Sequence, residues 1–220
     1  MKLYYASGAC SFVPHTLLEA AGADFEPVQV KLHRDEQHSP EYLAINPDGQ
    51  VPVLVDGDAV ITQIVAIVDH LDRRFAAAGF LPTEPLARTR ALSVLAWMNN
   101  TVHPTFTHIF MPQKFTDKPE LHADLKAFNR VRYEGCLDAL QSLVLQAQAA
   151  HGAGAWLSGA SFGPLDSYAL TLTRWGSMVG IDPCKRSTLW AFIEKRVAAH
   201  PPVAAVLERE RVPLNLYKPA

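Results

Sequence analysis

The order of strands and helices in the first 75 residues constrains the fold of this chain more than any other feature. The segment 2–6 (KLYYA) is typical of a strand. Residues 11–21 carry apolar side chains at helical spacing, and Gly22 follows as a helix stop. The segment 25–32 (FEPVQVKL) predicts a second strand. The chain therefore begins as strand, helix, strand.

The alternation continues to residue 75. Residues 39–41 (SPE) combine a helix N-cap, a proline at the first helical position and an acid in the first turn, so a short helix begins there and ends near Asn46. An Asp-Gly-Asp turn joins two short strands over 53–55 and 59–61. A helix over about 63–75 completes the order β-α-β-α-β-β-α.

The character of the sequence changes after this unit. Gly79, Pro82 and Pro85 indicate a linker, and no convincing strand follows. We predict an α/β domain over 1–77, a linker over 78–86 and an all-helical domain over 87–220. The expected helices of the second domain are 86–111, 119–150, 164–180, 187–199 and a short C-terminal piece.

Composition excludes several classes of function. The net charge is −2 with acids and bases interspersed, so nucleic acid and anionic membranes are not expected as partners. No apolar run reaches the roughly 18 residues of a transmembrane helix, and the N-terminus lacks the apolar core of a signal peptide. Three cysteines far apart disfavour a disulfide framework and favour the cytoplasm, and the scattered histidines disfavour a metal site.

Cys10 lies where the first strand turns into the first helix. A helix N-terminus favours negative charge, so this position predicts a thiol pKa below the usual value of about 8.5. The alternative is a buried, inert cysteine. No second cysteine follows two residues later, which disfavours a dithiol oxidoreductase.

Three motifs together resemble the cytosolic glutathione S-transferases, and most of all their bacterial beta class. They are MKLYYASGACSFVPH at the start, YLAINPDGQVPVL from Tyr42 and WLSGASFGPLDSYAL from Trp156. The resemblance covers essentially the whole chain. It implies a thioredoxin-like N-terminal domain, an all-helical C-terminal domain, glutathione as co-substrate and a cytoplasmic homodimer that serves detoxification.

The resemblance also implies the site. Cys10 would lie beside the glutathione sulfur, with Ser11 as the fallback hydroxyl. A cis bond between Val51 and Pro52 would leave the Val51 backbone free to pair with an extended peptide ligand. His15 lies about 140° around the helix from Cys10, so we interpret it as structural. The other implied glutathione contacts are Gln50, Gln63, Ile64 and Asn99, and the implied wall of the acceptor-substrate pocket is Tyr5, Phe106, Phe110 and Trp175.

Two departures from the family weaken this picture. Gln63 and Ile64 replace the usual acid and Ser or Asn that hold the γ-glutamyl end of glutathione. Losing one charge-assisted hydrogen bond costs about 1.5–3 kcal/mol, roughly 10- to 100-fold in affinity. In addition, Phe106 aligns with the beta-class histidine near the thiol. His103 is a candidate substitute, and so is His108, but a surface or core role is equally consistent with either.

The segment FGPLDSYAL predicts a helix start and no catalytic group. Gly163 takes the N-cap and Pro164 the first turn, and Asp166 bonds back to the Gly163 N–H from a buried position.

The sequence leaves two main functions open. The first is an enzyme that conjugates glutathione to small apolar electrophiles, exchanges thiols and disulfides through Cys10, or does both. The alternative is a non-catalytic homologue that binds another ligand or a partner protein. A third, a redox sensor whose Cys10 is glutathionylated as a signal, differs from the first only in turnover.

Overall fold

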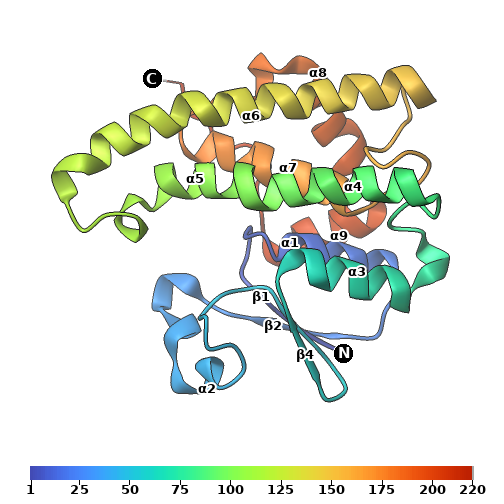
Figure 1. Cartoon of the computed structure of the whole chain (residues 1–220), viewed down its shortest axis with the longest axis horizontal. Coiled ribbons are helices and arrows are strands. Elements are labelled where there is room, and N and C mark those ends of the chain that lie inside the picture. The colour runs from blue at the N-terminus through green and yellow to red at the C-terminus, as the bar shows by residue number, and fades with distance from the viewer. Residues whose placement is uncertain (220) are drawn as a thin grey trace.

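The computed structural model describes residues 1–219 and consists of a small α/β unit beside a larger set of helices (Figure 1). The strands β1 (Lys2–Tyr5), β2 (Glu26–Gln29), β3 (Val53–Asp56) and β4 (Ala59–Thr62) form one sheet in the order β2-β1-β3-β4. β1 runs parallel to β2 and antiparallel to β3, and β3 runs antiparallel to β4. Leu3 pairs with Leu54 at the centre of the sheet, where both side chains are fully buried.

Three helices accompany the sheet: α1 (Phe12–Ala20), α2 (Pro40–Leu43) and α3 (Ile64–Arg74). α1 and α3 lie between the sheet and the helical part of the molecule, whereas α2 lies away from the helical part (Figure 1). The predicted cap of the short helix is confirmed, because the Ser39 hydroxyl accepts from the Tyr42 N–H at 3.2 Å. This is the predicted thioredoxin-like order.

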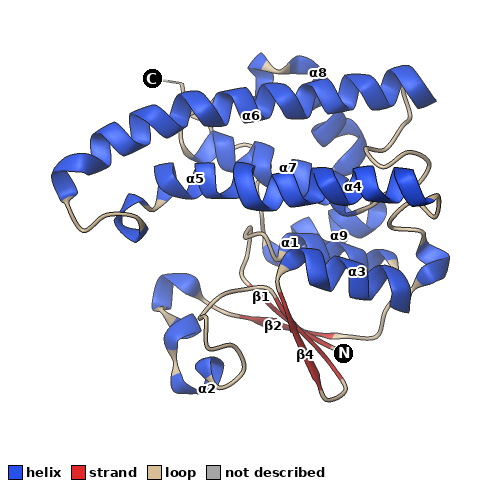
Figure 2. Ribbon diagram, in the orientation of Figure 1, coloured by secondary structure: helices blue, strands red, loops and turns tan. Residues whose placement is uncertain are grey.

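The rest of the described chain consists of helices and the loops that connect them (Figure 2). It also has one isolated bridge, between Trp156 and Gly159. α7 is its central helix, and every residue from Pro164 to Ser177 is buried. The predicted fold class is therefore confirmed. The helices are α4 (Pro85–Trp97), α5 (His103–Phe110), α6 (His122–His151), α7 (Pro164–Met178), α8 (Ser187–Phe192) and α9 (Pro201–Glu210).

The predicted helix over 86–111 is interrupted. A π-helical segment, Met98–Val102, separates α4 from α5 just before Pro104. Proline lacks an N–H and its ring crowds the carbonyl four residues earlier, so the backbone widens there. A second π-helical segment, Ile193–Val197, follows α8 and ends in a turn, so the predicted 187–199 helix is shorter and less regular than expected.

One apolar core joins the two parts, with α1 packed against both α7 and α9. Among the described residues, no helix combines the length and the apolar character that crossing a membrane requires.

Candidate functional site

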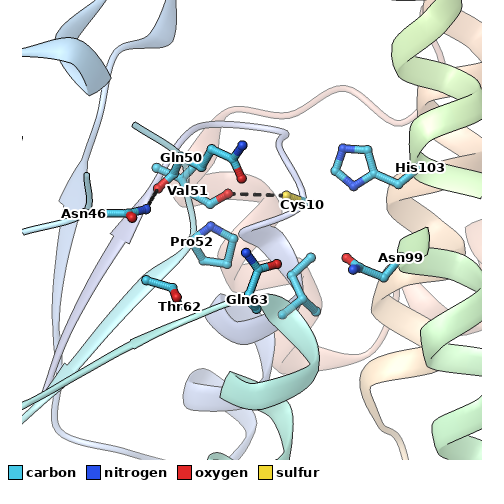
Figure 3. Close-up of a pocket in the computed structure, with 10 residues that line it drawn as sticks. Cys10, Asn46, Gln50, Val51, Pro52, Thr62, Gln63, Asn99 and His103 are labelled. Atoms are coloured by element: carbon cyan, nitrogen blue, oxygen red, sulfur yellow. Dashed lines mark hydrogen bonds between the residues drawn. The ribbon is translucent and has the colours of Figure 1, made fainter. Parts of the chain in front are cut away.

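A cavity at the junction of the α/β unit and the α4–α5 helices contains every residue that we predicted to contact glutathione (Figure 3). It also contains His103, which was a candidate substitute for the family's histidine near the thiol, and two residues that the sequence did not place there, Asn46 and Thr62. His103 lies four residues after Asn99, so helical spacing alone puts the two on one face. The lining residues are Cys10, Asn46, Gln50, Val51, Pro52, Thr62, Gln63, Ile64, Asn99 and His103.

Cys10 lies in the loop between β1 and α1, and its thiol donates to the Val51 carbonyl oxygen at 3.6 Å (Figure 3). The residue is only 8% exposed. Burial raises the pKa of the Cys10 thiol to about 12, although the backbone N–H groups of residues 10 and 11 act in the opposite direction. The predicted low pKa is thus wrong for the ligand-free protein. Loss of hydration opposes the thiolate more strongly than the helix N-terminus stabilises it.

The ligand-free Cys10 thiol should accordingly alkylate slowly. Because only the thiolate reacts, its rate with iodoacetamide should climb about tenfold per pH unit from about pH 7 to about pH 10, without a plateau. Mass spectrometry of the Cys10 peptide measures this rate separately from Cys136 and Cys184. Free glutathione serves as the reference thiol, because it levels off above its own pKa. A plateau for Cys10 near neutral pH would contradict the raised pKa.

The loop before β3 presents the Val51 backbone to the cavity. The Val51–Pro52 bond is cis, as predicted. The Gln50 carbonyl oxygen accepts from the Tyr42 hydroxyl at 2.7 Å and from the Asn46 amide at 2.8 Å, which fixes the loop. Gly49 has a φ of 60°, and a Cβ there would lie 2.8 Å from the His38 ring. The loop therefore depends on glycine at this position.

The start of α3 forms another side of the cavity. Gln63 has a φ of 68°, a backbone conformation that costs a residue other than glycine about 1–3 kcal/mol and that occurs mostly at functional sites. Its side chain does not cap the helix. The first N–H groups of α3 lack intrahelical acceptors, and this end of a helix attracts anions. Ile64 is buried and adds no polar side-chain atom.

His103 faces the same cavity from the helical side (Figure 3). Its Nδ1 lies 2.9 Å from the Tyr168 hydroxyl, which also lies 3.3 Å from Asn99 Oδ1. Burial lowers the pKa of His103 to about 4, with a smaller contribution from Lys114, so the imidazole is neutral at pH 7. When the hydroxyl donates to Asn99, it accepts from Nδ1–H, and Nε2 then carries the lone pair.

Several predicted site residues lie elsewhere. Ser11 is fully buried and its hydroxyl bonds only to the backbone of Ala6, so its expected role as fallback hydroxyl is corrected. The expected apolar wall is also absent from this cavity. Phe110 instead lines a separate cavity of about 480 Å³ between α5, α6 and the end of α7. The other three wall residues point into the core, where their exposed fractions are 7% for Tyr5, 5% for Phe106 and 5% for Trp175.

His108 and His15 are held away from the cavity. His108 Nδ1 lies 2.6 Å from the Pro104 carbonyl oxygen, and its ring stacks on Phe115. His15 is fully buried and lies 2.7 Å from Glu210. The structural interpretation of His15 fits these contacts.

The comparisons with known proteins agree with this geometry. Residues 1–73 match the family model described as the glutathione S-transferase N-terminal domain. The chain is 30% identical over 217 residues to glutathione S-transferase GstA of Escherichia coli O157:H7, a match that covers 96% of this chain and 98% of that protein. The chain belongs to the glutathione S-transferase family.

Solved structures of this family share the whole fold. A sphingomonad glutathione S-transferase complexed with glutathione is 32% identical, with a TM-score of 0.80 over 97% of this chain and 100% of its own. A bacterial beta class glutathione S-transferase of Sphingomonas chungbukensis is 29% identical, with a TM-score of 0.79 over 96% of this chain and 98% of its own. The predicted family and its likeness to the beta class are confirmed.

Proposed function

We propose that this member of the glutathione S-transferase family is an enzyme that uses glutathione as co-substrate in the Cys10 cavity. The observation that carries the proposal is that one cavity gathers the thiol of Cys10, the Val51 backbone and the start of α3. These features suit two parts of a γ-glutamyl-cysteinyl-glycine peptide: Val51 and Cys10 suit the cysteinyl residue, and the start of α3 suits the γ-glutamyl carboxylate.

The tripeptide would lie extended along the loop before β3. Its cysteinyl backbone would pair with the N–H and C=O of Val51, as an added strand pairs with a sheet edge. That pairing brings the ligand sulfur to Cys10, whose thiol already contacts the Val51 carbonyl. The γ-glutamyl carboxylate would then accept from the first N–H groups of α3. Because the enclosed space is only about 70 Å³, much of the ligand would face solvent.

Thiol–disulfide exchange fits this cavity better than conjugation to large apolar electrophiles, because the predicted aromatic wall does not line it. The Cys10 thiolate would attack the glutathione sulfur of a mixed disulfide and release the partner thiol. A second glutathione thiolate would attack the resulting Cys10–glutathione disulfide, which regenerates Cys10 and releases glutathione disulfide. Conjugation to small electrophiles would use the bound glutathione thiolate directly and leave no bond to Cys10.

His103 is the side chain of the helical part that we assign to hydrogen bonding with the reacting thiols. His103 is the histidine among the residues that line the cavity, and its imidazole is neutral at pH 7. In the tautomer set by Tyr168 and Asn99, Nε2 accepts a hydrogen bond from a thiol in the cavity. Because the pKa of His103 is about 4 and that of the Cys10 thiol about 12, the imidazole does not take the thiol proton, and the attacking thiolate forms by loss of its proton to solvent.

Assembly and location follow the family. We propose a homodimer that works in the cytoplasm. Sedimentation of the purified protein measures its oligomeric state, and a mass near twice 24.2 kDa is the expected result.

Calorimetric titration of the reduced protein with glutathione tests the proposal. We expect a dissociation constant in the millimolar range, because Gln63 supplies no charge and Ile64 supplies no side-chain hydrogen bond. No heat up to tens of millimolar glutathione would overturn the proposal and favour a homologue with another ligand or a protein partner.

The same titration with a double variant tests the contact between glutathione and the start of α3. Replacing Gln63→Glu and Ile64→Ser together should tighten binding about 10- to 100-fold, since it restores a charged and a hydroxyl contact. The matched control is Asp48→Glu with Val60→Ser, two exposed positions that do not line the cavity. Equal affinities for the double variant and the control would place the γ-glutamyl end away from α3.

A further inference from the structure

The loop that carries Cys10 is held at Gly8 by the helical part of the molecule. The Gly8 N–H donates to Glu210 Oε2 of α9 at 2.8 Å. The Gly8 carbonyl oxygen accepts from Trp175 Nε1 at 2.8 Å and from Arg174 Nη1 at 3.3 Å, both on α7. Both polar groups of one peptide residue are therefore occupied by side chains more than 160 residues away in the sequence.

The partners of Gly8 are themselves fixed. The Glu210 side chain is fully buried, and its second oxygen lies 2.7 Å from Nδ1 of the equally buried His15. Arg209 Nη1 lies 3.0 Å from His15 Nε2 and donates to Glu19 at 2.7 Å. Since a guanidinium only donates, His15 Nε2 accepts the hydrogen bond from Arg209. The proton of the ring is then on Nδ1, which donates a hydrogen bond to Glu210. Buried groups with all their hydrogen bonds satisfied resist movement.

Arg174 is held as firmly as Glu210. Its Nε donates to the Pro213 carbonyl oxygen at 2.8 Å, and its side chain packs directly over Gly8. Gly8 has a φ of 67°, and a Cβ there would lie 2.8 Å from Arg174 Nη1. Backbone conformation and space both call for glycine at this position.

We propose that Trp175, Arg174 and Glu210, which we call the Gly8 clamp, are positioning residues for the thiol. They hold the backbone two residues before Cys10, and thereby keep its side chain against Val51 and away from solvent. The proposal deepens the proposed function, because it names the groups that set the exposure of the reactive thiol. It rests on that function only for the statement that Cys10 reacts with substrate.

The test measures the thiol and its loop without glutathione. In a Cys136→Ser, Cys184→Ser background, Cys10 is the remaining thiol. Trp175→Phe removes the indole N–H and keeps an aromatic ring against Phe106 and His103. The matched control is Trp156→Phe, a tryptophan of similar burial that packs on Phe162 and His200. The readouts are the rate of Cys10 alkylation by iodoacetamide and the amide exchange of the peptide containing residues 6–11.

Trp175→Phe should raise both rates about 3- to 10-fold, the effect of losing one hydrogen bond on a local opening. Trp156→Phe should lower the melting temperature about as much as Trp175→Phe does. It should nevertheless leave both rates within twofold of those of the parent protein. Glu210→Gln should act like Trp175→Phe, and the exposed Glu208→Gln should not. Unchanged Cys10 alkylation and loop exchange in folded Trp175→Phe and Glu210→Gln would overturn the proposal.

The unmutated protein offers a check that does not depend on folding of the variants. The Gly8 amide should exchange as slowly as amides in the core of α7, and exchange at the rate of an exposed loop amide would contradict the clamp. Because these measurements omit glutathione, a null titration with glutathione would refute the proposed function and leave the clamp standing.

Discussion

Replacing Cys10 by alanine is expected to reduce glutathione-dependent reduction of mixed disulfides to the uncatalysed rate. The proposed exchange passes through a covalent bond to the Cys10 sulfur, and alanine offers no atom for that bond. Glutathione disulfide production, followed through coupled oxidation of a nicotinamide cofactor, measures the effect. Cys10→Ala should bind glutathione within about threefold of the parent protein, because the expected peptide contacts come from Val51 and α3.

The control for this variant is Cys136→Ala. Cys136 is half-buried on α6 and does not line the cavity, so its loss should leave the exchange rate unchanged. If Cys10→Ala keeps the full rate of exchange, Cys10 is not the nucleophile. Retained conjugation of small electrophiles together with lost exchange would assign Cys10 to disulfide chemistry alone.

Replacing Asp166 by alanine is expected to lower the free energy of unfolding by about 2–4 kcal/mol, because one buried and one partly buried N–H donor lose their acceptor. The carboxylate is fully buried and accepts from the Gly163 N–H at 2.8 Å and the Leu157 N–H at 2.9 Å. It therefore ties the start of α7, the most buried helix, to the segment before it. Urea unfolding followed by tryptophan fluorescence measures the change.

Asp124→Ala is the matched control for this loss. Asp124 also lies in the first turn of a helix, α6, but it is exposed, so its removal should cost less than about 1 kcal/mol. Asp166→Asn keeps one acceptor oxygen and should fall between the two. A loss below about 1 kcal/mol for Asp166→Ala would mean that α7 does not depend on the hydrogen bond from the Gly163 N–H to Asp166.

The elements with strong local signals were predictable from the sequence. The Asp-Gly turn between β3 and β4, the Ser39 cap of α2 and the Asp166 bond to Gly163 are each set by residues within a few positions of one another. The cavity residues from the N-terminal motifs were predictable for a different reason. Val51 lies 41 positions after Cys10, and the resemblance to the family, not a local signal, indicated that the two lie together.

The properties that depend on distant contacts were not predictable. The helix N-terminus near Cys10 indicated a low thiol pKa, but packing of the loop against the rest of the molecule buries the sulfur and reverses the direction. Trp175 has the helical spacing of a pocket wall, yet its indole N–H bonds to Gly8, a residue 167 positions earlier. Pro104 is a local signal for an interrupted helix, but it specifies neither the π-helical segment Met98–Val102 nor the place of His103 at the cavity.

The contact between Gly8 and Glu210 also orders the events of biosynthesis. The two residues are 202 positions apart, so at about 5–20 residues per second a ribosome needs about 10–40 s to add the second after the first. During that interval the nascent α/β unit lacks the groups that fix its thiol loop. With the proposed clamp, Cys10 acquires its shielded setting only when translation has reached α9, and prematurely terminated chains would carry an unshielded thiol.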